Sequence, residues 1–133
     1  MTILRIAFAV FISVGVTLIF EDSFIYFPSR YPAGDWQAPQ RAGVKVEDAE
    51  MRTSDGVKIH GWYFPTEGAK YTVLFFHGNA GNLSDRFYWM AKLTEIPANI
   101  LIIDYRGYGK SEGDPSEEGL YLDAEAGWDW LVE

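Results

Sequence analysis

Two short apolar runs, each followed at once by a loop of small or glycine-rich sequence, constrain the fold of this chain most. Residues 72–76 are apolar or β-branched throughout and end at His77-Gly78, and residues 99–104 form a second such run. Strands that are apolar on both faces occur inside parallel sheets covered by helices. Backbone N–H groups just after such a strand lie at the edge where open α/β sheets bind ligands. The sequence therefore predicts an α/β fold with a ligand-binding edge that begins at His77.

The elements around these two runs predict a mainly parallel sheet. Residues 46–53 and 57–64 alternate in polarity around the turn Ser54-Asp55-Gly56, which predicts an antiparallel hairpin. Apolar residues at helical spacing predict a helix over 83–95, and a second helix is expected to begin at Ser116 with an acidic first turn. Strand, helix, strand and helix in this order indicate a βαβ unit with helices on both faces of the sheet.

The first twenty residues form a separate apolar segment. Residues 6–20 carry no charge, and residues 1–20 would extend about 30 Å as a helix, which is one hydrocarbon thickness. We predict an uncleaved, single-pass membrane anchor here. A cleaved signal peptide and a buried core helix are the alternatives, but no small-residue cleavage site precedes Glu21. Arg5 before the span favours a cytoplasmic N-terminus and an extracytoplasmic body.

The chain therefore divides into three predicted parts. Residues 1–22 form the transmembrane anchor, residues 23–44 a tether rich in proline and glycine, and residues 45–133 the folded domain. Two apolar strands and one hairpin leave an apolar sheet edge unprotected. We therefore expect the chain to be the N-terminal part of a larger protein.

Composition excludes several classes of function. The net charge of −8 argues against nucleic acid as a partner, because phosphate binding needs a basic surface. The chain has no cysteine, which excludes disulfides, cysteine-based metal sites and a thiol nucleophile. It has only two histidines, too few for a histidine-rich metal site. We expect neither a metal nor an organic cofactor.

Two motifs carry a resemblance to a known family. They are His77-Gly-Asn-Ala-Gly-Asn82 after the first apolar run and Asp104-Tyr-Arg-Gly-Tyr-Gly-Lys-Ser111 after the second. In this order and on these predicted strands, they resemble the α/β-hydrolase superfamily, and most closely its serine-aminopeptidase-like, membrane-anchored hydrolases. The resemblance covers residues 24–133 and includes Tyr26-Phe27-Pro28 of the tether.

The resemblance implies a serine hydrolase that cleaves an ester, thioester or amide through an acyl-enzyme. In that family the loop after this strand supplies one oxyanion N–H, which maps to the backbone of Asn79. His77, Gly78 and Ala80 would shape the loop, with His77 as a structural histidine. The nucleophile, acid and base would lie beyond residue 133. The expected partner is the carbonyl of a small-molecule or peptide substrate, and this chain alone would be inactive.

Gly109-Lys-Ser111-Glu-Gly113 matches two motifs whose contexts it lacks. As G-x-S-x-G it would place a nucleophile on a tight turn between strand and helix, but the apolar strand ends at Asp104 and the helix begins only after Pro115. As a phosphate-binding loop it would need a glycine where Asp104 stands. We therefore interpret the loop as structural.

Two polar residues receive structural interpretations. We expect Asp104 to fix the turn 106–111 by hydrogen bonds, and His60 to lie on the surface of the hairpin. Two functions other than hydrolysis stay open. The chain could be a non-catalytic fragment that pairs its open strand edge with a partner, or an α/β domain that binds a nucleotide.

Overall fold

A mixed sheet of four strands, in the order β2-β3-β6-β4, organises residues 21–133, which are the residues described by this computed structural model. In chain order the elements are α2 (Glu21–Ile25), β1 (Phe27–Pro28), α3 (Ala38–Ala42), β2 (Glu47–Arg52), β3 (Lys58–Phe64), β4 (Tyr71–Phe76), β5 (Ala80–Gly81), the 3₁₀ helix η1 (Leu83–Arg86), α4 (Phe87–Leu93), β6 (Ala98–Ile103) and α5 (Glu117–Val132). The predicted anchor over 1–22 lies outside the described residues except for its last two positions. Among residues 21–133, none of the helices has the length and hydropathy needed to span a bilayer.

The sheet is mixed, which corrects the prediction of a mainly parallel one. β4 and β6 pair in parallel, with Phe76 opposite Ile103. The predicted hairpin is confirmed as β2 and β3, but β3 also pairs antiparallel with β6. Because the second strand of the hairpin is inserted beside the βαβ unit, two of the three pairings within this four-stranded sheet are antiparallel.

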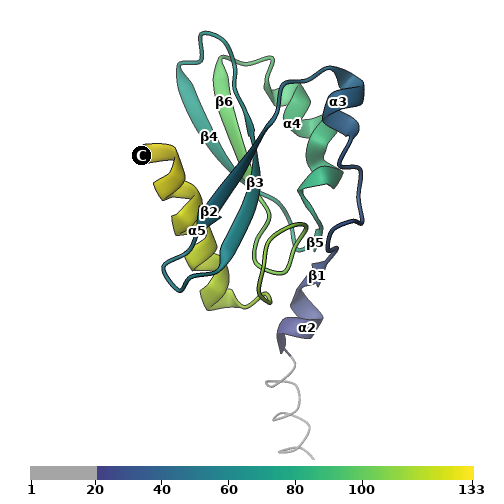
Figure 1. Cartoon of the computed structure of the whole chain (residues 1–133), viewed down its shortest axis with the longest axis vertical. Coiled ribbons are helices and arrows are strands. Elements are labelled where there is room, and N and C mark those ends of the chain that lie inside the picture. The colour runs from purple at the N-terminus through teal and green to yellow at the C-terminus, as the bar shows by residue number, and fades with distance from the viewer. Residues whose placement is uncertain (1–20) are drawn as a thin grey trace, which may run out of the picture.

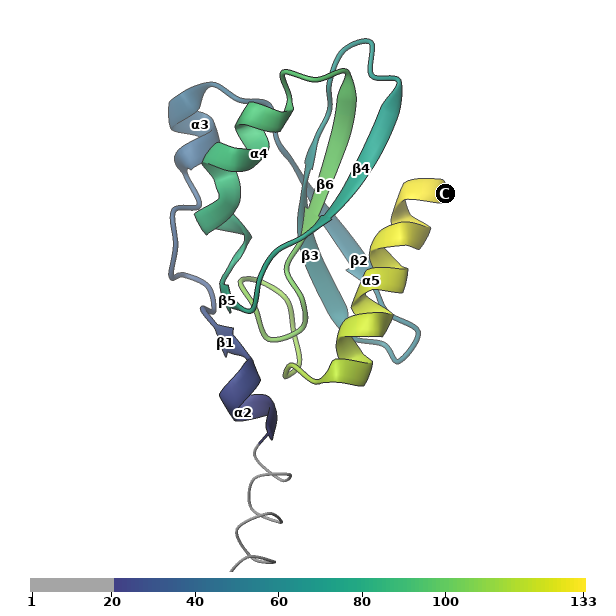
Figure 2. The ribbon, with the colours of Figure 1, turned by 180° about the vertical axis from the view of Figure 1, so that it is seen from behind.

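Helices cover both faces of the sheet, as predicted. α3 and α4 lie on one face and α5 on the other (Figures 1 and 2). β6 supplies both cores, because successive side chains of a strand point to opposite faces. Ile100 and Ile102 join the core under α4, whereas Leu101 and Ile103 join the core under α5, and all four are fully buried. This double burial explains the continuous apolar sequence of the strand.

The helix boundaries follow capping chemistry. Ser116 is the N-cap of α5, as the sequence predicts. Its hydroxyl accepts a hydrogen bond from the Gly119 N–H. The helix predicted over 83–95 is instead divided into η1 and α4. Asn82 caps η1 in a capping box with Asp85, so this helix begins directly at the end of the loop after β4.

The interval predicted as a tether contains regular structure and packs on the domain. β1 pairs in parallel with β5, in the loop after β4. Arg30 forms a bridge with Gly109, in the loop after β6. Further along, Ala38 at the start of α3 is buried against the core under α4. The N-terminal segment thus crosses both loops before it enters the sheet.

An arginine joins the loop after β6 to two other elements. The Arg106 guanidinium contacts Asp123 of α5 at 2.9 Å and Asp55 of the β2–β3 turn at 2.9 Å. Its hydrogen bonds to Asp55 lower the pKa of that carboxyl to about 2. Burial raises the pKa of Asp123, which is fully enclosed and also accepts the Arg106 N–H at 2.8 Å. One guanidinium therefore fixes a turn, a loop and a helix.

We predict that Asp123→Ala lowers the free energy of unfolding by about 3 kcal/mol, because it leaves a largely buried guanidinium without one of its two partners. Asp129→Ala on the exposed face of α5 is the matched control and should change it by less than about 0.5 kcal/mol. Urea unfolding of the two variants measures both values. Equal destabilisation by the two substitutions would contradict the role given to Arg106.

Candidate functional site

The two loops that carry the sequence motifs meet at one edge of the sheet. β4 and β6 are parallel neighbours that end level with each other, at Phe76 and Ile103. The residues that follow them, 77–82 and 104–111, therefore project from the same edge, next to β1 and α2 (Figure 1). This is the edge at which parallel strands of α/β proteins present ligand-binding loops.

Asp104 holds the two loops together. Its carboxylate accepts the Leu83 N–H at 2.7 Å and contacts His77 Nε2 at 3.2 Å, and it is fully buried. The expected link to the turn 106–111 comes from its backbone, because the Asp104 carbonyl accepts the Ser111 hydroxyl at 2.7 Å. The predicted hydrogen bond to the turn is thus made by the Asp104 backbone, and the side chain in addition serves the loop after β4.

His77 is enclosed at the base of the loop. Its Nδ1 lies 2.7 Å from the Gly78 carbonyl, and its Nε2 faces Asp104. The side chain is fully buried and packs against the rings of Tyr105 and Tyr108, with ring centroids 5.0 and 5.2 Å away. Both ring nitrogens have partners within the fold, so neither is directed at a substrate. This is the arrangement expected of a histidine that shapes a loop.

Asn79 is held by three hydrogen bonds while its N–H is left without an acceptor among the described residues. Its carbonyl accepts the Phe27 N–H at 2.9 Å and the Tyr108 hydroxyl at 2.8 Å. Its side-chain amide donates to the Ile25 carbonyl at 2.7 Å. Within residues 21–133 the Asn79 N–H makes no hydrogen bond, and residues 78–80 are exposed. An oriented, unused donor of this kind could bind a developing oxyanion.

Two tyrosines of the loop after β6 support the same backbone. The Tyr105 hydroxyl lies 3.3 Å from the His77 carbonyl and the Tyr108 hydroxyl donates to Asn79. Burial raises the pKa of Tyr105 to about 12 and also raises the pKa of Tyr108. Both phenols are therefore protonated at neutral pH and can act as donors.

Asn82 joins the N-terminal segment to the loop after β4, a role that we did not predict from the sequence. It is fully buried, and its side-chain amide donates to the Ser29 and Ala33 carbonyls at 3.0 and 2.9 Å. Its side-chain oxygen accepts the Ser84 N–H at 3.0 Å. The available signal was the Asn82-Leu-Ser-Asp85 pattern of a capping box before a helix.

Ser111 is buried and fully used in structure. Its hydroxyl donates to the Asp104 carbonyl and accepts the His60 N–H at 2.9 Å. His60 is also buried, which corrects its predicted surface position, because Trp36 of the N-terminal segment covers it with ring centroids 5.8 Å apart. Burial lowers the pKa of His60. Its Nε2 contacts Asp48.

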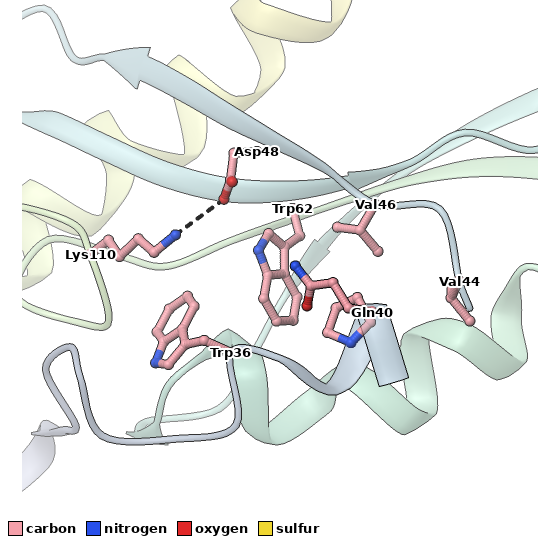
Figure 3. Close-up of a pocket in the computed structure, with 8 residues that line it drawn as sticks. Trp36, Gln40, Val44, Val46, Asp48, Trp62 and Lys110 are labelled. Carbon is pink, nitrogen blue, oxygen red and sulfur yellow. Dashed lines mark hydrogen bonds and ion pairs between the residues drawn. The ribbon is translucent and has the colours of Figure 1, made fainter. Parts of the chain in front are cut away.

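Lys110 points away from the Asn79 loop into a cavity of about 150 Å³ on the α3 side of the sheet (Figure 3). The indoles of Trp36 and Trp62 line this cavity, and Lys110 lies 3.3 Å from Asp48 and 5.0 Å from the centre of the Trp36 ring. The Gly109 and Ser111 N–H groups donate to backbone carbonyls. The Gly-Lys-Ser sequence therefore does not form a cradle of free N–H groups for phosphate.

No family model matches the chain. Curated relatives do: an uncharacterised protein of Mycobacterium tuberculosis is 39% identical over 120 residues, covering 87% of this chain and 42% of the relative. The α/β hydrolase domain-containing protein WAV2 of Arabidopsis thaliana is 36% identical over 129 residues, covering 88% of this chain and 40% of the relative. A solved esterase of Pyrococcus furiosus superposes with a TM-score of 0.64 at 28% identity, covering 80% of this chain and 42% of the esterase.

The chain belongs to the α/β-hydrolase superfamily. It spans about two fifths of the length of the curated relatives named above. Among residues 21–133, no group of three histidine, aspartate or glutamate side chains is placed to hold a metal ion.

We predict that a fluorophosphonate probe leaves the 133-residue chain unlabelled. The one serine in a G-x-S-x-G pattern, Ser111, is 4% exposed and its hydroxyl proton is committed to a carbonyl. Gel fluorescence after incubation with the probe measures the outcome. Labelling that disappears in Ser111→Ala would make Ser111 the nucleophile and contradict its structural role.

Proposed function

We propose that this chain is the N-terminal part of a membrane-anchored serine hydrolase that cleaves an ester, thioester or amide through an acyl-enzyme. In this proposal the Asn79 N–H is one of the two oxyanion donors, and the nucleophile, acid and base lie beyond residue 133. The general class agrees with the hydrolases and esterases to which the chain is similar. The serine mechanism, the anchor over 1–22 and an extracytoplasmic body are parts of the proposal.

The free N–H of Asn79 carries the proposal. Oxyanion stabilisation is strongest when the donor is held in place before the reaction, since no reorganisation is then needed as charge develops. Three hydrogen bonds hold the Asn79 carbonyl and side chain, and they come from Ile25, Phe27 and Tyr108. These bonds hold the loop on the carbonyl side of Asn79. The Asn79 N–H itself lies in the peptide unit of the Gly78 carbonyl, which is 2.7 Å from His77 Nδ1, and residues 78–80 are exposed. A loop with only a structural role would not need an unused donor held in this way.

Pairing of the open strand edge is the second candidate. Among the described residues β4 has β6 as its one neighbour in the sheet, and Tyr71 and Phe76 at its ends are exposed. Translation of the gene past codon 133 distinguishes the two candidates. An apolar strand that leads into G-x-S-x-G within about 30 residues, the length of one βαβ unit, supports the hydrolase.

We predict that Asn79→Pro in the longer protein lowers kcat for an ester substrate by about 10²-fold to 10³-fold, because proline removes the backbone N–H and with it one oxyanion donor. Steady-state hydrolysis of a chromogenic ester measures this loss.

Asn79→Ala is the matched control, because it keeps the N–H and removes only the side-chain bond to Ile25. It should retain most of kcat. Thermal melts of both variants separate loss of catalysis from loss of folding. If the two variants lose kcat equally while both remain folded, the Asn79 N–H is not an oxyanion donor.

A further inference from the structure

We infer that the proposed active-site edge faces the bilayer at close range, and that the substrate is a long-chain acyl ester or thioester dissolved in the membrane. This inference rests on the proposed function. It depends on where the N-terminal segment attaches to the domain, on the distance this leaves to the apolar sequence, and on the side chains exposed there.

The attachment point is the candidate oxyanion loop itself. α2 is followed directly by β1, and the Asn79 side chain binds the carbonyl of Ile25, the last residue of α2. The Phe27 N–H then donates to the Asn79 carbonyl at 2.9 Å. No length of free linker separates the end of α2 from the loop. Figures 1 and 2 show α2 at the end of the molecule where this loop lies.

The distance that results is short. The uncharged sequence ends at Phe20, and Asn79 is bonded to Ile25, five residues later. Five helical residues extend about 7.5 Å. The headgroup layer on each side of a bilayer is about 5–8 Å thick. An anchor that ends near Phe20 therefore holds the Asn79 N–H at, or just above, the headgroup layer.

The side chains exposed at this end suit such a position. Four large apolar side chains remain accessible at this end, with exposed fractions of 70% for Phe24, 41% for Ile25, 55% for Phe27 and 41% for Phe76. Aromatic residues are enriched at membrane–water interfaces. The far end of the sheet also exposes large apolar side chains, Tyr71 at 69% and Ile96 at 48%, beside the polar turn at Glu67 and Gly68. The position of the anchor therefore decides which end faces the bilayer.

Electrostatic attraction to lipid headgroups does not explain why this end of the molecule would lie near the bilayer. The chain has a net charge of −8, and α2 begins with Glu21-Asp22. Attraction to anionic lipids requires clusters of lysine and arginine. Two arginines near the loop are already engaged, Arg30 with Asp114 at 2.8 Å and Arg86 with the Ala80 carbonyl at 2.8 Å. Proximity to the bilayer therefore comes from the anchor and the apolar side chains, which favours an acyl chain as the recognised group.

The geometry can be tested on this chain without activity. Because the chain has no cysteine, Ala80→Cys beside Asn79 and Glu67→Cys at the far end each give a single site for a fluorescent label, and both positions are exposed. In phosphatidylcholine vesicles with nitroxide-labelled headgroups, we expect quenching at position 80 to be several-fold stronger than at position 67. A ten-residue Gly/Ser insertion between Phe20 and Glu21 should remove the difference. Equal quenching at both positions without the insertion would overturn the inference.

The substrate class is tested in the longer protein with the same insertion. It should lower hydrolysis of a long-chain ester embedded in vesicles at least about tenfold and leave hydrolysis of a water-soluble short-chain ester unchanged. The same insertion at Gly68, in an exposed turn, is the control and should change neither rate. Unchanged hydrolysis of the embedded ester would overturn the substrate class and leave the hydrolase intact. Absence of hydrolysis of both esters by the unmodified protein would instead overturn the proposed function, whatever the quenching shows.

Discussion

The buried carboxylate of Asp104 is the contact on which the rest of this edge depends. Removing a carboxylate from water costs several kcal/mol unless donors replace the lost hydration. Here the Leu83 N–H and His77 Nε2 both face Oδ1, at 2.7 and 3.2 Å, whereas the buried Oδ2 has no hydrogen-bond partner among the described residues. The backbone of the same residue donates to the His60 carbonyl and accepts the Ser111 hydroxyl. One position at the end of β6 therefore joins β3, the loop after β4 and the loop after β6.

The glycine-rich sequence after Asp104 follows from this enclosure. Gly109 has a φ of +48°, and a β-carbon there would lie 1.9 Å from Asp104 Oδ2. Any side chain at position 109 would therefore displace the carboxylate and with it the loop after β4. The same glycine bonds through its N–H to the Ser29 carbonyl. Its place in the motif thus has a steric reason, which is independent of the G-x-S-x-G pattern that it happens to complete.

The sequence predicted the elements that depend on local pattern. The alternation in the hairpin, the apolar runs of β4 and β6, and the Ser116 cap each depend on residues close in sequence, and all agree with the structure. The pairing partners of a strand depend on residues distant in sequence. The antiparallel pairing of β3 with β6 was therefore missed, and the sheet was expected to be mainly parallel. The position of His60 was missed for the same reason: its cover, Trp36, comes from a segment without periodicity.

The N-terminal segment shows most clearly where pattern reading fails. Its prolines and glycines suggest a linker, because they prevent long helices and strands. They do not prevent single backbone hydrogen bonds to other segments. β1 has only two residues. The N–H of its first residue, Phe27, donates to the Asn79 carbonyl, and the N–H of Ser29, just after it, donates to the Gly81 carbonyl. A two-residue strand leaves no periodic signal in sequence. The candidate site could therefore be located from its two motifs. The N-terminal segment that packs against both motif loops could not be predicted as part of it.

The three contacts that hold Asn79 come from one side of the edge. They involve Ile25, Phe27 and Tyr108, which precede α5 in the sequence. β4, by contrast, is only partly buried although it is as apolar as β6, so the sheet has room for a further strand beside it. The Asn79 N–H lies in the peptide unit of the Gly78 carbonyl, which faces His77 Nδ1 at 2.7 Å, so the contacts on both sides of this peptide unit are made without that strand. Under the proposed function, this part of the protein sets one oxyanion donor by itself, and the residues that follow need only bring a nucleophile to it.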